Sequence, residues 1–90
     1  MLGIMSILAI HEELQLGRVI RSARHQRGWT QHELAARANV SRAVLQKLEE
    51  GRGGTVNLAT AFRLLQAMSL DLAIANRPGN PIRLEPDVYV

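Results

Sequence analysis

The length and composition of the chain indicate one small globular domain. Its 90 residues suffice for a single modest core, and the hydrophobic share of 47% excludes a disordered chain. With only one Trp, one Tyr and one Phe, the core must be built mainly from aliphatic side chains. The absence of cysteine excludes disulfides and thiolate metal sites, and it favours a cytoplasmic protein. The formal net charge of +3 agrees with a polyanionic partner but is too small to identify one.

Residues 1–11 are predicted to form an apolar N-terminal arm. The first ten residues read MLGIMSILAI, a stretch too short to span a bilayer, without a basic leader or a clear cleavage site. We therefore expect no membrane segment. The arm either packs on the domain or on a second subunit, or translation begins at Met5 and shortens it.

Residues 12–69 have the periodicity of a helical domain. The first helix is expected over residues 12–27, with Gly28 as the left-handed residue that ends it. Thr30 and Glu33 form a capping box that begins the second helix, and Asn39 tolerates the left-handed backbone that ends it. The inward-facing side chains of these two helices are predicted to be Leu16, Val19, Ile20, Ala23, Leu34, Ala35 and Ala38.

Two further helices complete this domain. Ser41 is expected to cap a third helix that continues to about Glu50, and either Asn57 or Thr55 to cap a fourth. The predicted apolar stripe of the fourth helix consists of Leu58, Ala61, Phe62, Leu65 and Met68. The second and third helices, joined by a tight turn, have the spacing of a helix-turn-helix, the motif that places one helix in the DNA major groove.

Beyond residue 69 the apolar period changes from that of a helix to that of a strand. Leu70, Leu72 and Ile74 alternate with other residues and predict a strand over residues 70–77. A lone strand cannot satisfy its own backbone groups, so we expect it to pair with the same strand of a second subunit across a twofold axis. Two alternatives remain: a hairpin with the extended tail, residues 78–90, or an extended segment packed on the fourth helix.

The region from residue 16 to residue 77 resembles the xenobiotic-response-element family of helix-turn-helix regulators, also called the Cro/cI-type or lambda-repressor-like family. The matching residues are Leu16, Gly17, Ile20, Arg24, Gly28, Trp29, Thr30, Gln31, Glu33, Leu34, Ala35, Val40, Ser41, Leu45, Glu49 and Gly51. The resemblance implies a mainly α fold of four to five helices, followed by a short C-terminal β-strand that pairs across a dimer.

A narrower resemblance is to the HipB-type antitoxins. In that family a tryptophan follows the glycine after the first helix, as Trp29 follows Gly28 here, and a strand follows the fourth helix. The resemblance implies a homodimer that binds a palindromic operator in double-stranded DNA and represses its own operon. It also implies a HipA-type kinase toxin as a partner that the dimer neutralises.

The residues expected to contact DNA lie on or beside the second and third helices. Arg42 can bridge guanine O6 and N7 or clamp a phosphate, and Lys47 can reach a base edge or the backbone. Ala43 is small enough for a thymine methyl group to approach, and the family resemblance places Gln31 on a phosphate. The alternative for each is an ordinary exposed side chain. The predicted DNA-binding residues are Gln31, Ser41, Arg42, Ala43, Gln46, Lys47 and Arg52.

The resemblance also implies a structural ion pair between Arg24 and Glu49, which links the first helix to the end of the third. Removal of one partner would leave a buried charge without compensation, at a cost of about 3–5 kcal/mol. Trp29 is expected to lie in or near the core.

No catalytic site, metal site or cofactor is predicted. The three histidines include no pair at helical spacing of four residues, and the glycines after the third helix lack the lysine of a phosphate loop. The resemblance therefore implies a cytoplasmic, nucleoid-associated repressor and antitoxin. The alternatives are a stand-alone regulator of the same fold, such as a phage-type repressor or a restriction–modification controller, and a protein-interaction module without DNA binding.

Overall fold

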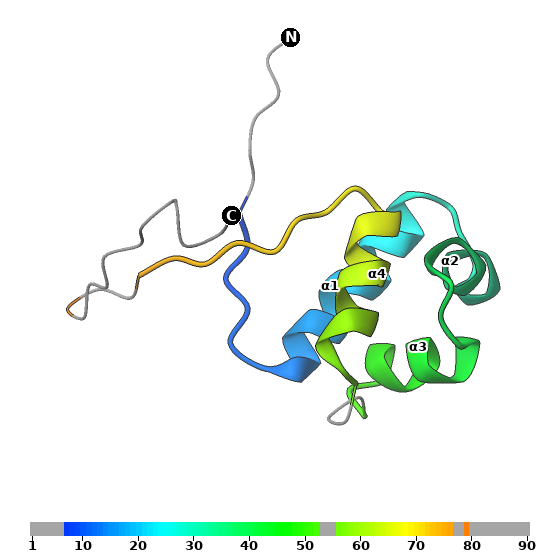
Figure 1. Cartoon of the computed structure of the whole chain (residues 1–90), viewed down its shortest axis with the longest axis horizontal. Coiled ribbons are helices and arrows are strands. Elements are labelled where there is room, and N and C mark those ends of the chain that lie inside the picture. The colour runs from blue at the N-terminus through cyan, green and yellow to red at the C-terminus, as the bar shows by residue number, and fades with distance from the viewer. Residues whose placement is uncertain (1–6, 53–55, 77–78, 80–90) are drawn as a thin grey trace, which may run out of the picture.

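The structure, a computed structural model, describes residues 7–52, 56–76 and 79. In these residues it has four helices, α1 (Glu13–Gln26), α2 (Gln31–Ala38), α3 (Arg42–Glu49) and α4 (Leu58–Ala67) (Figure 1). The mainly α fold is therefore confirmed, with the lower of the two helix numbers predicted. None of the described helices has the length and hydropathy needed to cross a membrane.

Helices α2, α3 and α4 begin where the sequence places capping side chains, whereas the residue before α1, Glu12, makes no capping hydrogen bond through its side chain. The side chains of Thr30, Ser41 and Asn57 accept hydrogen bonds from the third backbone N–H of α2, α3 and α4, at 3.0, 3.3 and 2.8 Å. At α2 the Glu33 carboxylate also accepts from the Thr30 N–H at 3.0 Å, which completes the predicted capping box. That backbone hydrogen bond lowers the pKa of the Glu33 carboxyl.

The four helices end in the same way. Gly28, Asn39, Gly51 and Ser69 follow them with φ angles of 69°, 55°, 79° and 58°. After each of these residues the next backbone N–H bonds to the carbonyl oxygen five residues earlier, at 2.8–3.2 Å. This pattern is the Schellman motif, which satisfies carbonyl groups that a helix end leaves unpaired. The left-handed backbone at Gly28 and Asn39 was predicted, whereas that at Ser69 was not.

Aliphatic side chains from all four helices form the core. They are Ile20, Ala23, Leu34, Ala35, Ala38, Leu45, Leu48, Leu64, Leu65 and Met68. Leu16, Val40 and Leu70 pack against this cluster while remaining partly exposed.

The predicted stripe of α4 is wrong at two positions. Leu58 and Phe62 are 64% and 37% exposed, whereas Leu64, which was not predicted, is fully buried. The sequence of α4 allows two overlapping stripes with three- and four-residue spacing, and α4 packs on α2 through the later one. Periodicity alone cannot choose between the two faces because both are apolar.

Helix α1 approaches α3 very closely at Gly17. This residue is buried, and a Cβ atom built on it would lie 2.0 Å from the backbone oxygen of Leu48. Any side chain at this position would therefore force the two helices apart.

The segment after α4 is not a strand in this single chain. Leu70 is half-buried, while Leu72 and Ile74 are 50% and 71% exposed. The predicted strand needs a neighbouring strand for its hydrogen bonds, and the one described chain offers none over residues 70–76. Pairing with a second subunit therefore stays a prediction, and the alternative hairpin lies outside the described residues.

Candidate DNA interface

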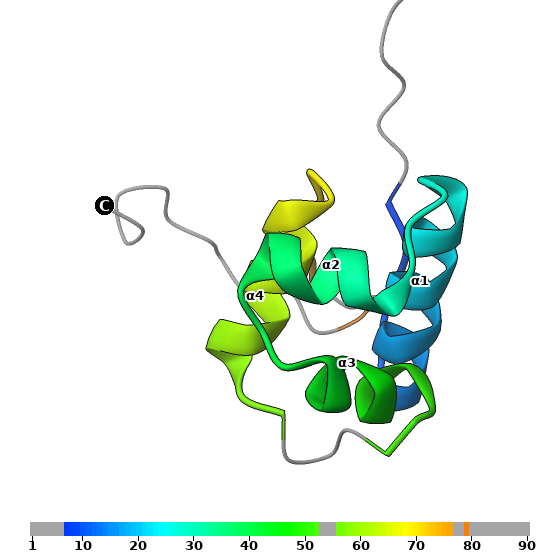
Figure 2. The same cartoon turned by 90° about the vertical axis from the view of Figure 1, so that its right-hand side faces the viewer.

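Helix α3 holds its predicted DNA-binding side chains on the outer face of the helix-turn-helix. Figures 1 and 2 both show α3 at the lower edge of the helical bundle, beside α2. Leu45 and Leu48 bury one face of α3 in the core. The residues of α3 and its cap that were predicted to contact DNA are all exposed: Ser41, Arg42, Ala43, Gln46 and Lys47.

A buried ion pair fixes the position of α3 on α1. The Arg24 Nε and Nη2 atoms donate to the two carboxylate oxygens of Glu49, each at 2.8 Å. The residues are only 7% and 6% exposed. Arg24 also donates to the backbone oxygen of Trp29 at 2.8 Å, so the contact extends to the residue before α2. The hydrogen bond to Glu49 raises the pKa of Arg24, which therefore stays charged.

Gln31 connects α2 to the same ion pair. Its Nε2 atom donates to Glu49 Oε1 at 3.2 Å, and the residue is half-buried at the first position of α2. An amide nitrogen carries two hydrogens, so this contact leaves one of them for a phosphate oxygen. Any DNA contact through Gln31 is thus mechanically linked to Glu49, which sequence reasoning did not anticipate.

Sequence reasoning also missed Glu50. Its carboxylate accepts a hydrogen bond from Gln46 Nε2 at 3.3 Å and one from Arg52 Nε at 3.1 Å, and Arg52 Nη2 donates to it as well. Two of the predicted DNA contacts are therefore held by one acidic side chain. The hydrogen bond from Arg52 is the main reason that the pKa of Glu50 lies below its usual value. The spacing of four residues between Gln46 and Glu50 was the available signal for the first of these contacts.

Trp29 lies beside the core, as predicted. It is half-buried against the core cluster, and the guanidinium carbon of Arg37 lies 4.2 Å from the centre of its ring. This cation–π contact joins the loop before α2 to the last turn of α2.

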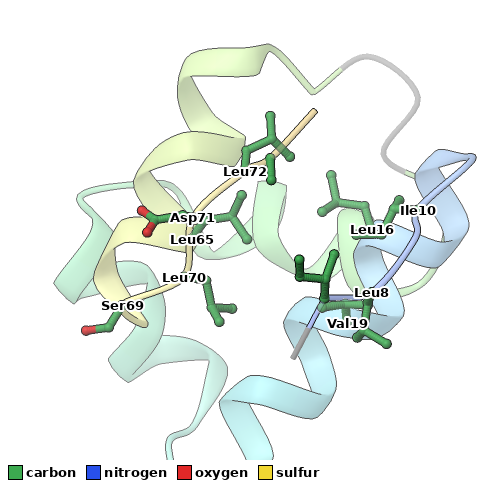
Figure 3. Close-up of a pocket in the computed structure, with 11 residues that line it drawn as sticks. Leu8, Ile10, Leu16, Val19, Leu65, Ser69, Leu70, Asp71 and Leu72 are labelled. Carbon is green, nitrogen blue, oxygen red and sulfur yellow. The ribbon is translucent and has the colours of Figure 1, made fainter. Parts of the chain in front are cut away.

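An apolar hollow lies apart from the helix-turn-helix. It has a volume of about 440 Å³, and no residue of α2 or α3 lines it. Figure 3 shows Leu16 and Val19 of α1 on one side, and Leu70 and Leu72 of the segment after α4 on the other. The rest of the lining consists of Ile7, Leu8 and Ile10 of the arm, Leu65 of α4, and Ser69, Asp71 and Ala73. Two of the three residues predicted for the dimer strand thus border an unfilled apolar surface.

The described residues include no group of three or more His, Asp or Glu side chains arranged to hold a metal ion. Their buried side-chain nitrogen and oxygen atoms all have hydrogen-bond partners.

Comparison with known proteins identifies the family of the chain. A family model described as Helix-turn-helix matches residues 20–74. The antitoxin HipB of Escherichia coli O6:H1 (strain CFT073) and that of Escherichia coli K12 are each 32% identical to the chain over 72 residues. These alignments cover 80% of this chain and 76% and 81% of the two relatives. The chain belongs to the HipB antitoxins of the helix-turn-helix family.

A solved HipB structure has the same fold. The HipB chain of a HipA-HipB-O2-O3 complex is 28% identical, with a TM-score of 0.71 over 78% of this chain and 97% of that chain. The resemblance inferred from the sequence is therefore confirmed. The family match begins within α1 and ends at residue 74, so it includes α2, α3, α4 and most of the predicted dimer strand.

Proposed function

We propose that the chain is a sequence-specific DNA-binding repressor and the antitoxin of a HipA-type kinase module. The observation that carries the proposal is the outer face of α3, where Arg42, Ala43 and Lys47 are exposed on a helix whose opposite face is locked in the core. A helix presented in this way fits the major groove, where base edges are distinguishable.

In this proposal the DNA-binding residues have two roles. Arg42, Ala43 and Lys47 face base edges, with Arg42 suited to guanine and Ala43 to a thymine methyl group. Gln31 and Arg52 lie at the two ends of the motif and position it on phosphates. Ser41 caps the start of α3 and Gln46 lies on the flank of the helix, where each can add a polar contact to the DNA backbone or to a base.

The proposed repressor acts as a homodimer on a palindromic operator. Leu70, Leu72 and Ile74 supply the dimer strand, and pairing with a twofold-related copy would satisfy backbone groups of this segment. The apolar hollow beside Leu70 and Leu72 gives the second subunit a surface to bury. Two α3 helices related by a twofold axis would read two half-sites of the palindrome, whose separation is set by the geometry of the dimer.

The proposed protein partner is a HipA-type kinase toxin. Support comes from family membership and from the HipB chain of the HipA-HipB-O2-O3 complex, which shares the fold. A complex that holds toxin and DNA together requires a toxin surface away from α3, which leaves α1, α4 and the tail. We propose no catalytic activity for the chain, and we place its action on nucleoid DNA in the cytoplasm.

The test is a pull-down of the tagged chain from its native host, with bound protein and bound DNA identified together. We expect a kinase-like partner and the chain's own promoter. Promoter DNA without a protein partner would instead indicate a stand-alone regulator, and a protein without DNA would indicate an interaction module.

Substitutions on α3 test the DNA face directly. Arg42→Ala and Lys47→Ala should each lower affinity for the promoter duplex, by about 1–3 kcal/mol where a base contact is lost, because exposed side chains of α3 make the contacts. Binding is measured by fluorescence anisotropy at constant salt, with melting temperature as the check on folding. Arg18→Ala, an equal loss of charge on the exposed side of α1, is the matched control. Equal losses for all three variants would contradict the assignment of α3.

A further inference from the structure

Glu50 is an acidic side chain at a position where electrostatics disfavours one. It follows the last residue of α3, where the partial negative charge of the helix dipole already lies. In the proposed complex it would also lie close to DNA phosphates. Two neighbouring side chains with hydrogen-bond donors offset this cost in the free protein, because Arg52 and Gln46 both donate to the Glu50 carboxylate.

The same contacts reduce what Arg52 can do for DNA. Its guanidinium donates to Glu50 through both Nε and Nη2, and both side chains are exposed, at 65% for Arg52 and 42% for Glu50. An arginine whose charge is already neutralised by a carboxylate adds little to the free energy of phosphate binding unless the arginine first separates from that carboxylate. Exposed ion pairs are weak, at about 0–1 kcal/mol, so a well-placed phosphate can separate this one.

We propose that Glu50 is a specificity-determining residue, which withholds Arg52 from random DNA and releases it on the operator. The inference rests on the proposed DNA-binding function. Non-specific binding comes almost entirely from phosphates neutralised by free cations, so a paired Arg52 weakens it. On the operator, base contacts by α3 fix the docking geometry and hold a phosphate where it can displace Glu50. Glu50 therefore costs more affinity on random DNA than on the operator.

The experiment compares wild type, Glu50→Gln, Arg52→Gln and the double variant on two duplexes of equal length. One duplex carries the chain's own promoter and the other a random sequence, and binding is measured from 50 to 200 mM salt. On random DNA, Glu50→Gln should steepen the slope of log affinity against log salt concentration by about 0.9 per bound subunit. The gain in affinity over wild type should then be about threefold larger at 50 mM than at 200 mM salt. The gain on the promoter should be smaller, so the ratio of specific to non-specific affinity should fall.

The double variant separates this device from a general charge effect. With Arg52 replaced, Glu50→Gln should lose the added slope, because no arginine remains to be released. Glu13→Gln makes the same change of net charge at an exposed residue of α1, and its effect should not depend on Arg52. An equal effect of Glu50→Gln with and without Arg52 would overturn the inference, and so would an unchanged slope.

Two further readouts keep the outcomes distinct. Melting temperatures verify that each variant is folded. Glu50→Ala removes the hydrogen-bond acceptor altogether and should show the same salt slope as Glu50→Gln. A different slope for Glu50→Ala would reject the inference. If wild type binds the promoter but the Glu50 variants match it, the inference fails and the proposed function stands. If wild type binds neither duplex, the proposed function fails and the inference falls with it.

Discussion

At the scale of single residues, the buried pair of Arg24 and Glu49 fixes how the helices of the helix-turn-helix are placed. Its two-point geometry connects α1 to the end of α3, and Gln31 adds α2 through the same carboxylate. Removal of water from two charges offsets much of their attraction, so the net stability of such a pair is small. Its value here lies in register, because it holds three elements of the DNA-binding region in one arrangement.

Glu49→Ala should therefore lower stability and DNA affinity together. It leaves the Arg24 guanidinium buried without a counter-charge, at a cost of about 3–5 kcal/mol of unfolding free energy. Chemical unfolding followed by circular dichroism measures the loss, and anisotropy measures promoter binding. Glu50→Ala is the matched control. Glu50 is the exposed neighbour of Glu49, and its removal should change the unfolding free energy by about 0.5 kcal/mol or less. Lost promoter binding at unchanged stability would refute the structural role of Glu49.

At the scale of secondary-structure elements, the helices are delimited by local signals of different quality. Their ends use glycine twice, at Gly28 and Gly51, but asparagine and serine at Asn39 and Ser69. Glycine adopts the left-handed backbone freely, and asparagine tolerates it through local hydrogen bonds, whereas serine incurs steric strain. The end of α4 is thus the one of these four sites with an avoidable cost.

Ser69→Gly should stabilise the fold by about 1 kcal/mol, since relief of the left-handed strain exceeds the added entropy of glycine in the unfolded chain. Asn39→Gly, the same change at a residue that already tolerates this backbone, should have an effect near zero. Thermal and urea unfolding measure both. A loss of stability in Ser69→Gly would show that its side chain contributes more than its backbone costs.

At the scale of the whole molecule, the two proposed functions, DNA binding and dimerisation, occupy separate surfaces. The proposed DNA face is α3 with its exposed cationic side chains, and the apolar hollow lies among the arm, α1, the end of α4 and the segment after it (Figure 3). Leu72 is 50% exposed and Ile74 is 71% exposed. In a single chain, contact of these apolar side chains with water forgoes the free energy that their burial would contribute. A second subunit that covers them would leave α3 free for DNA.

The double substitution of Leu72→Asp with Ile74→Asp should convert the dimer to a folded monomer. Charge repulsion across a twofold axis opposes strand pairing, while the helical core does not involve these exposed residues. Sedimentation measures the mass, and promoter affinity should fall because a monomer reads only one half-site. Leu58→Asp, an exposed apolar residue of α4 outside the hollow, should remain dimeric. A double variant that is still dimeric would exclude this segment as the dimer strand.

The sequence by itself determined the features that depend on a few neighbouring residues. Thr30 and Ser41 cap α2 and α3 because their side chains reach N–H groups three residues away, and Asn39 adopts the turn that separates the two helices. For α4 the sequence narrowed the cap to Asn57 or Thr55, and Asn57 is the residue that accepts the capping hydrogen bond. The exposure of Arg42 and Lys47 also follows from the amphipathic spacing of α3. These interactions are local, so their geometry is nearly independent of the rest of the fold.

Only the tertiary structure decided the features that depend on a neighbouring helix. Packing on α2 selected the buried face of α4, turning Phe62 outward and Leu64 inward. Contact between segments 18 residues apart tied Gln31 to Glu49, and the close crossing of α1 and α3 excluded a side chain at Gly17. Periodicity states which faces of a helix are apolar, but shape complementarity with a partner chooses among them. For Leu70, Leu72 and Ile74, pairing with a second chain stays a prediction, because a strand is completed only by the strand beside it.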